Sequence, residues 1–257
     1  MRGRLHRRAA GMGIAVLLAA GLPGIGSAQA PNPQWLRFTV ATIKPDMTAE
    51  YEGYQKQMAA AYKKAGLSGY VVFQNFAGPR NEYTAVTFVT KFADLDGPNP
   101  IAKAVGEEAY QNLISHLTRC TVSSNRYFAR PWDDVAIDKP GPMGQYILRS
   151  RIPIASGKAE EYRAYIKNEL KPIYEKAGVT WFHASQPSFG GPVGMVETVR
   201  MLKNLAEIDG GPIVTRVLGA AGAATVNKKA DGLTRGETQR TILRMRPDLS
   251  LMPPPAK

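Results

Sequence analysis

The chain has 257 residues, of which 44% are hydrophobic and 21% are charged, and it contains one cysteine. This composition excludes disordered, collagen-like and disulfide-rich chains, and the length suits one or two domains with a substantial core. The formal charge is +12 at pH 7. A charge of this size points first to a polyanionic partner.

The N-terminal residues have the parts of a secretory signal peptide. Residues 1–8 carry four arginines and no acid, residues 9–22 are almost wholly apolar, and small residues lead to Ala28 and Ala30. The apolar run is short for a membrane span, and a retained N-terminal anchor is the alternative. We expect residues 1–30 to be removed on export to the periplasm or the medium. Their removal lowers the formal charge to +8 and leaves no segment that we expect to enter a membrane.

After this leader, the pattern of apolar residues predicts the same series of elements twice. In the first copy we expect strands at residues 35–43, 70–73, 83–92 and 123–130, with helices at 48–65 and 101–117. In the second copy we expect strands at residues 146–154, 180–184, 194–202 and 238–245, with helices at 156–177 and 213–229. The order is βαββαβ in both copies.

The two copies are also similar in sequence. Residues 50–66 read EYEGYQKQMAAAYKKAG, and residues 161–178 read EYRAYIKNELKPIYEKAG. Such self-similarity indicates an internal repeat. We therefore expect repeat 1 at residues 31–137, a linker at 138–144, repeat 2 at 145–250 and a flexible tail at 251–257.

The second copy has one extra residue inside its first helix. Seven residues separate Tyr54 from Tyr62, whereas eight separate Tyr165 from Tyr174. The extra residue lies near Pro172, which has no N–H for a helical hydrogen bond. We therefore expect a kink or a π-bulge near residues 168–174.

The order βαββαβ is that of the ferredoxin-like unit, whose sheet has helices on one face and an open face on the other. Two such units can cover each other, sheet to sheet. The chain therefore resembles the dimeric α+β barrel superfamily, with the usual dimer fused into one α+β chain. Residues 157–178 are similar to the first helix of NIPSNAP-like members. The resemblance implies ligands inside the barrel, or between the sheet and its helices.

Alternating arginines are the first candidates for a site. Arg149 and Arg151 share one face of the strand at residues 146–154, and Arg240 and Arg244 share one face of the last strand. Guanidinium groups bind carboxylate, phosphate or sulfate through two parallel hydrogen bonds. The alternative is that these side chains lie at strand ends with their charged groups in water.

Trp181 and His183 share one face of the strand at residues 180–184. The histidine is a candidate base or haem ligand, or a hydrogen-bonded structural residue. No second ligand stands at a diagnostic spacing, so we expect no metal site. The sequence also lacks a phosphate-binding glycine loop and a Gly-x-Ser-x-Gly motif.

Two functions are compatible with these features. The first is an exported protein, a monomer or low-order homo-oligomer, that binds a small anionic or aromatic ligand or a partner. The alternative is a barrel enzyme of the monooxygenase, isomerase or haem-dependent type, and the sequence does not decide whether the protein is an enzyme or which cofactor it uses. Nucleic acid is not expected, because the second repeat covers the open sheet face and export separates the protein from nucleic acid.

Overall fold

The structure is a computed structural model that describes residues 34–141 and 144–252. Its first half contains β1 (Trp35–Ile43), α1 (Thr48–Lys64), β2 (Tyr70–Ala77), β3 (Glu82–Val89), α2 (Pro100–Val105), α3 (Glu107–Arg119) and β4 (Thr121–Pro131). Its second half contains β5 (Ile137–Asp138), β6 (Tyr146–Pro153), α4 (Ala159–Tyr165), α5 (Lys171–Lys176), β7 (Trp181–Phe189), β8 (Met195–Leu202), α6 (Ala206–Asp209), α7 (Ile213–Lys228) and β9 (Gln239–Met245). The predicted export signal lies outside the described residues, as do residues 253–257 of the expected tail.

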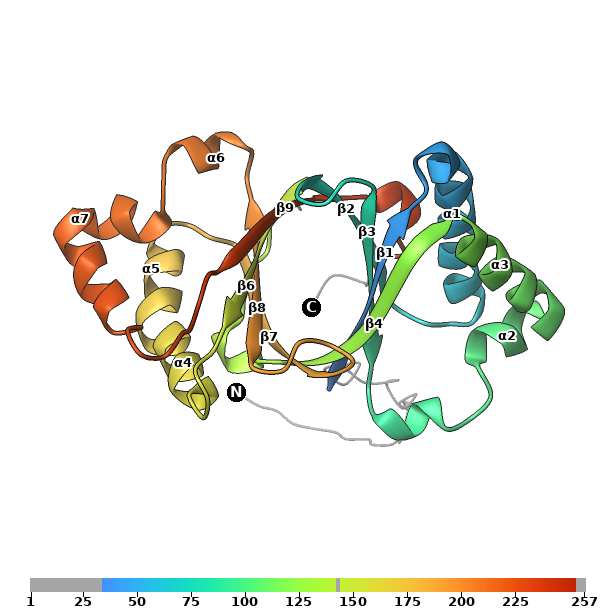
Figure 1. Ribbon diagram of the computed structural model, residues 1–257, viewed down its shortest axis with the longest axis horizontal. Coiled ribbons are helices and arrows are strands. Elements are labelled where there is room, and N and C mark those ends of the chain that lie inside the picture. Colours follow the sequence, from blue (N-terminus) through green and yellow to red (C-terminus); the bar gives the residue numbers. More distant parts are fainter. Residues whose placement is uncertain (1–33, 142–143, 253–257) are drawn as a thin grey trace, which may run out of the picture. The chain divides into compact units, whose positions relative to one another are not determined.

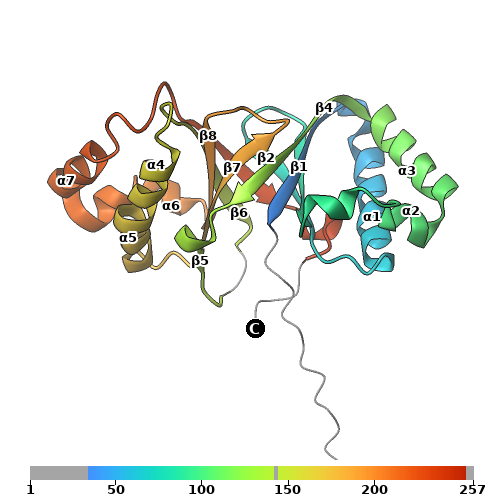
Figure 2. The ribbon, with the colours of Figure 1, turned by 90° about the horizontal axis from the view of Figure 1, so that it is seen from below.

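The predicted α+β barrel is confirmed, because eight antiparallel strands close on themselves. Each strand pairs with the next in the order β4-β1-β3-β2-β9-β6-β8-β7, and the pairing of β7 with β4 closes the ring. Figure 1 looks into this ring and shows α1 to α3 outside one side of it and α4 to α7 outside the other. The same two helical layers flank the strands in the perpendicular view of Figure 2.

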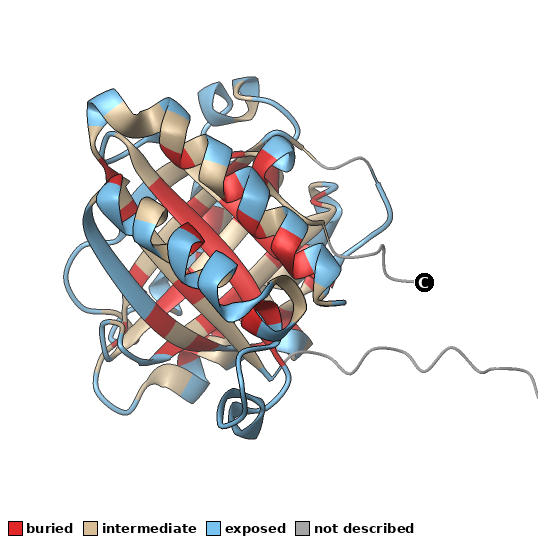
Figure 3. Ribbon diagram, turned by 90° about the vertical axis from the view of Figure 1, so that its right-hand side faces the viewer, coloured by how far each residue is buried: buried red, intermediate tan, exposed pale blue. Residues whose placement is uncertain are grey.

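Successive residues on each strand point alternately to the helices and to the barrel interior. The outward side chains pack under the helices in two large clusters, one containing Val72 and the other containing Val196. The helices in Figure 3 accordingly carry patches of buried residues beside exposed ones. The inward side chains form two smaller clusters, one around Phe38 and one around Leu243, and Phe73 packs against both. Apolar side chains of the two halves therefore meet inside the barrel.

Each half of the chain sends a segment into the core of the other half. After β4, Trp132 is buried among helix residues of the second half. After β9, Leu249 is fully buried among helix residues of the first half. Leu251, the first residue of the expected tail, forms a β-bridge with Tyr70. The two halves thus share their cores as well as their sheet.

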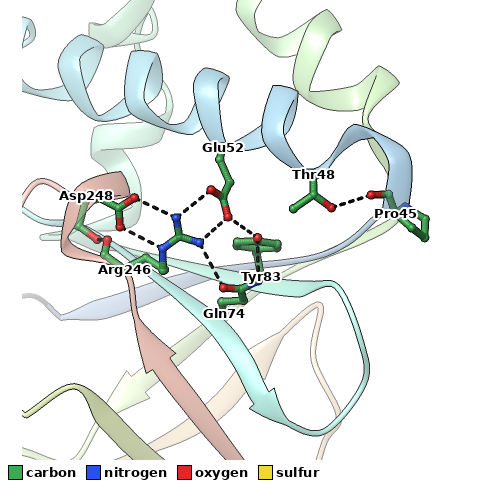
Figure 4. A network of polar contacts seen from close by, with 8 residues as sticks. Pro45, Thr48, Glu52, Gln74, Tyr83, Arg246 and Asp248 are labelled. Atoms are coloured by element: carbon green, nitrogen blue, oxygen red, sulfur yellow. Dashed lines mark hydrogen bonds and ion pairs between the residues drawn. The ribbon is translucent and has the colours of Figure 1, made fainter.

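Arg246 holds the segment that contains Leu249 against the first half of the chain (Figure 4). Its guanidinium donates to Glu52 on α1 at 2.8 Å, to Asp248 at 2.9 Å and to Gln74 at 3.1 Å. The Tyr83 hydroxyl donates to the same Glu52 carboxylate at 2.6 Å. Hydrogen bonds from Arg246 lower the pKa of both the Glu52 and the Asp248 carboxyl. This network ties the end of β9 to the first helix of the other half.

The helices differ from a regular pattern at three points. The expected bulge is confirmed: Ile166–Leu170 is a π-helix between α4 and α5, directly before the turn that contains Pro172. The helix expected at residues 101–117 is instead two helices, α2 and α3, which meet at Gly106 with φ +96°. Gly219, with φ +71°, kinks α7. None of the described helices is long and apolar enough to cross a lipid bilayer.

Candidate functional site

Strands β6 and β8 place charged side chains inside the barrel. On β6, Ile152 packs under the helices, so Arg149 and Arg151 take the opposite, inward face. Arg151 stands opposite Glu197 on β8, and Arg149 stands opposite Val199. Partners in a strand ladder project from the same face of the sheet. Glu197 and Val199 therefore face inward with the two arginines.

Arg151, Glu197 and Tyr127 form a polar contact across the interior. Arg151 Nε donates to Glu197 Oε1 at 2.7 Å, and the Tyr127 hydroxyl donates to Oε2 at 2.9 Å. Burial, followed by the charge of Glu197, raises the pKa of Tyr127. Burial lowers the pKa of Arg151, but attraction to Glu197 outweighs it and the pKa rises. These three groups satisfy one another, and the contact joins β4 of the first half to the second half.

Arg149 is the less well compensated cation. Its side chain is 4% exposed, with Nη2 3.5 Å from Glu82 Oε1 and Nη1 3.4 Å from Thr84 Oγ1, both on β3. These distances are long for hydrogen bonds. Arg149 Nε is buried and has no hydrogen-bond partner among the described residues. Burial lowers the pKa of Arg149, and the neighbouring Arg151 lowers it further.

His183 lies on the same inward row as Arg149. Both stand opposite Val199, which puts their Cα atoms two strand spacings apart, or about 10 Å. His183 Nε2 is buried and also lacks a partner within residues 34–141 and 144–252. The Trp181 ring lies 4.5 Å from the imidazole between centroids. Burial lowers the pKa of His183 and so favours the neutral ring, in which one nitrogen donates and the other accepts.

Four of the six residues singled out from the sequence face this interior: Arg149, Arg151, Trp181 and His183. Arg240 and Arg244 do not. In the pairing of β9 with β6, Arg240 stands opposite Ser150, on the face that points away from the barrel. Both residues are exposed there. The four arginines therefore do not form one cluster.

Sequence reasoning does not identify four polar residues of the first half that lie in the interior: Asn75, Glu82, Thr84 and Tyr127. Asn75 Nδ2 donates to Glu82 Oε1 at 2.9 Å, and Asn75 Oδ1 is a third buried atom without a partner among the described residues. The alternation of residues on β4 could have identified Tyr127, because it places Tyr127 and Arg126 on opposite faces of the strand.

No protein-family model matches the sequence, and no curated protein matches it. Solved structures match the fold. A candidate monooxygenase from Lactobacillus acidophilus NCFM gives a TM-score of 0.60 at 10% identity, covering 86% of this chain and 97% of that one. An anthrone oxidase-like protein gives 0.59 at 10% identity, covering 84% and 92%. A mutant chlorite dismutase from Candidatus Nitrospira defluvii gives 0.52 at 8% identity, covering 85% and 94%.

These matched proteins are dimeric α+β barrels, and this chain shares their fold. At 8 to 10% identity the likeness concerns the fold alone. What the chain does must therefore be argued from its own interior residues.

The resemblance to the barrel superfamily suggests haem as a candidate cofactor type, but the side chains of the described interior leave no room for a haem. Polar contacts of Arg149 and Tyr127 cross the interior, and Phe73 packs against apolar clusters of both halves. A macrocycle would have to break these contacts to reach His183. The described interior therefore does not accommodate a haem.

Proposed function

We propose that the barrel interior binds one small organic molecule that carries an acidic or hydrogen-bond-accepting group. The supporting observation is the pair of buried nitrogens, Arg149 Nε and His183 Nε2, which lack partners among the described residues and belong to one inward row. Buried polar atoms are nearly always paired in folded proteins. An acceptor group lying over Val199 would pair both nitrogens, with the imidazole proton on Nε2. An eight-stranded barrel is either filled by its own side chains or holds one small ligand.

The charges inside the barrel favour a weak or singly charged acid. Arg151 and Glu197 neutralise each other at 2.7 Å, whereas Arg149 has only a 3.5 Å contact with Glu82. One carboxylate, phenolate or enolate would complete the compensation of Arg149. Trp181 offers a flat apolar surface on which an aromatic ring can pack. We therefore expect small aromatic acids and phenols to bind best.

Ligand-dependent thermal stabilisation of the purified protein tests this site. We expect some small aromatic acids or phenols to raise the melting temperature, and Arg149→Met to abolish that rise. Arg37→Met is the matched control, because Arg37 is a part-buried arginine of the barrel wall that points outward and donates to Tyr62 and Thr87. The control lowers stability but keeps the ligand response. An unchanged response in Arg149→Met, or a panel in which no acid stabilises the protein, refutes the proposal.

A second candidate function is oxidation of the bound molecule by dioxygen. It is favoured by the fold likeness to a candidate monooxygenase and an anthrone oxidase-like protein. In the other neutral tautomer, with the proton on Nδ1, His183 Nε2 would accept the proton of an acidic C–H group, and Arg149 would stabilise the resulting negative charge. The CH₂ group would become a carbonyl, with one oxygen atom of O₂ in the product and the other in water. Oxygen uptake with a stabilising ligand tests this. His183→Gln should abolish the uptake but not the binding, and absence of uptake in the wild type contradicts the oxidase proposal alone.

We also propose that the protein is exported and that it is built from two ferredoxin-like repeats. Residues 1–30 would be cleaved, and the intact mass of protein recovered from the periplasm or medium tests this. Residues 31–137 and 145–250 would be the repeats, joined by residues 138–144. Their shared tyrosine pattern and equal element order support this division, and residues 157–178 support the closer likeness to NIPSNAP-like members.

A further inference from the structure

Arg240 and Arg244 lie on the outer face of the second half, where a third arginine joins them. Leu148 on β6 stands opposite Ile242 of β9 on one side and opposite Arg200 of β8 on the other. Ladder partners share a face, so Arg200 points outward with Arg240 and Arg244. Leu148 and Ile242, between them, are only partly buried. The outer face therefore has an apolar floor bordered by three guanidinium groups.

A cleft of about 450 Å³ opens at one end of this face. It lies between the start of β6, the end of β8, the turn from α5 to β7, and α6, and its walls include Val179, Leu202, Arg200, Lys203, Glu207 and Gln145. Its volume is in the range of clefts that hold small organic molecules. Val179, which is 7% exposed, contributes a small apolar surface to the cleft, whereas Leu202 in its wall is 0% exposed.

Cations outnumber anions around the cleft. Arg200 Nη1 donates to Glu207 at 2.9 Å, the one hydrogen bond of this guanidinium among the described residues. Lys203 Nζ lies 3.7 Å from the position that a Cβ on Gly178 would occupy, so the ammonium group lies over the turn that borders the cleft. When the Gln145 amide is turned so that its oxygen faces Arg244, Arg244 donates to it from Nε at 3.1 Å and from Nη2 at 3.0 Å. Glu207 therefore pairs with Arg200, and Lys203 and Arg244 are further cations in or beside the cleft.

The remaining arginine, Arg240, approaches the same region from β9. Burial raises the pKa of Tyr174, and the charges of Arg200 and Arg240 oppose this rise. The Tyr174 phenol packs edge-on against Phe182 at 5.1 Å between ring centroids, and Arg240, opposite Ser150, projects from the same outward face of β9 as Arg244. The positive charge continues from the cleft along the outer face of the sheet.

We propose that this cleft is a second binding site, separate from the barrel interior, for a small organic anion with an apolar body. Lys203 holds the carboxylate or phosphate group inside the cleft, Arg244 adds a second charge at its border next to Gln145, and Arg200, positioned by Glu207, contributes a third charge. The apolar body packs against Val179. A neutral molecule of the same shape binds poorly, because it leaves the surplus cations without a counter-charge.

Calorimetric titration with benzoate, and with benzamide as its neutral counterpart, tests the site. The titration is run in the wild type and in Arg149→Met, so that binding inside the barrel is separated from binding in the cleft. We expect benzoate to bind in both proteins, benzamide to bind at least tenfold more weakly, and Lys203→Gln with Arg244→Gln to weaken benzoate about tenfold. Both substituted side chains are at or near the surface, so the double variant should fold.

The matched control removes two positive charges elsewhere. Lys63→Gln with Lys64→Gln lies on the exposed end of α1 and should leave benzoate affinity within twofold. The proposal is overturned if this control weakens binding as much as the cleft variant, or if benzamide binds as well as benzoate. It is also overturned if Arg149→Met removes benzoate binding entirely, or if the wild type binds no benzoate at about 10 mM, where a cleft of this kind should be occupied.

Discussion

The crossing of Leu249 into the first half makes a quantitative prediction about how the protein unfolds. Leu249 is 0% exposed and lies in the cluster beneath α1, although it follows the last strand of the second half. Replacing a fully buried leucine by alanine removes its transfer free energy and leaves a cavity, at a cost of about 3 to 4 kcal/mol. Two hydrogen bonds hold the residues around Leu249 to β2: Arg246 N–H donates to Val72 O at 2.9 Å, and Val72 N–H donates to Ser250 Oγ at 2.9 Å. These bonds restrict the collapse of the backbone around the cavity.

Urea unfolding followed by circular dichroism measures this loss. With an m-value near 3 kcal/mol/M, the midpoint for Leu249→Ala should fall by about 1 M, and the melting temperature by about 10 °C. One cooperative transition should remain, because each half contains a core residue of the other. Leu218→Ala on α7 makes the same chemical change at a residue that is 37% exposed, and it should cost less than about 0.5 kcal/mol. Equal midpoints for the two variants, or separate transitions in the wild type, would refute the shared core.

Three further predictions concern the segments shared between the two halves and the barrel interior. Trp132→Ala, the counterpart of Leu249 in the first half, should cost about 3 to 5 kcal/mol by urea unfolding, and a loss below about 1 kcal/mol would contradict its anchoring role. Because Arg246 lowers the folded-state pKa of Glu52, the network stabilises the fold at neutral pH and loses this effect as the pH falls below the ordinary carboxyl range, about 4. Arg246→Met should therefore differ most from the wild type at pH 7 and least at pH 3, and a constant difference would argue against the network. Because burial lowers the pKa of His183, the wild type should lose stability as the pH falls from about 6.5 towards 5, whereas His183→Gln should lose less over that range.

Local pattern was sufficient for several elements. The nine alternating residues of β1 were predicted at 35–43, the bounds that the structure has. The π-helix at Ile166–Leu170 was predicted from one extra residue, because a helix with fixed ends and matched apolar contacts must accommodate the insertion inside itself. Both predictions depend only on nearby residues.

Strand lengths were not predictable where the partner strand comes from the other half. Residues 70–73 of β2 are apolar and were predicted, but the strand continues to Ala77 through polar residues that pair with β9. Likewise β7 was predicted to end at residue 184 and continues to Phe189, because Ser185 to Phe189 pair with β4. These extensions exist only because edge strands of one half pair with edge strands of the other, and no local sequence signal encodes that pairing.

The location of the arginines depends on which face of each strand must be apolar. Strand β6 lies in the middle of its half and beneath the helices, so its outward face carries Ile152 and its inward face is left for Arg149. Strand β9 lies at the border of its half and has little helical cover, so its inward face carries Leu243 and Arg244 is exposed to solvent. Alternation alone gives the residues that share a face, but not the face that lies inside. A residue pattern must therefore be combined with the helical cover of its strand before a charged face can be assigned to a barrel interior. By this criterion Arg149 belongs to the interior site, and Arg244 belongs to the cleft on the outer face.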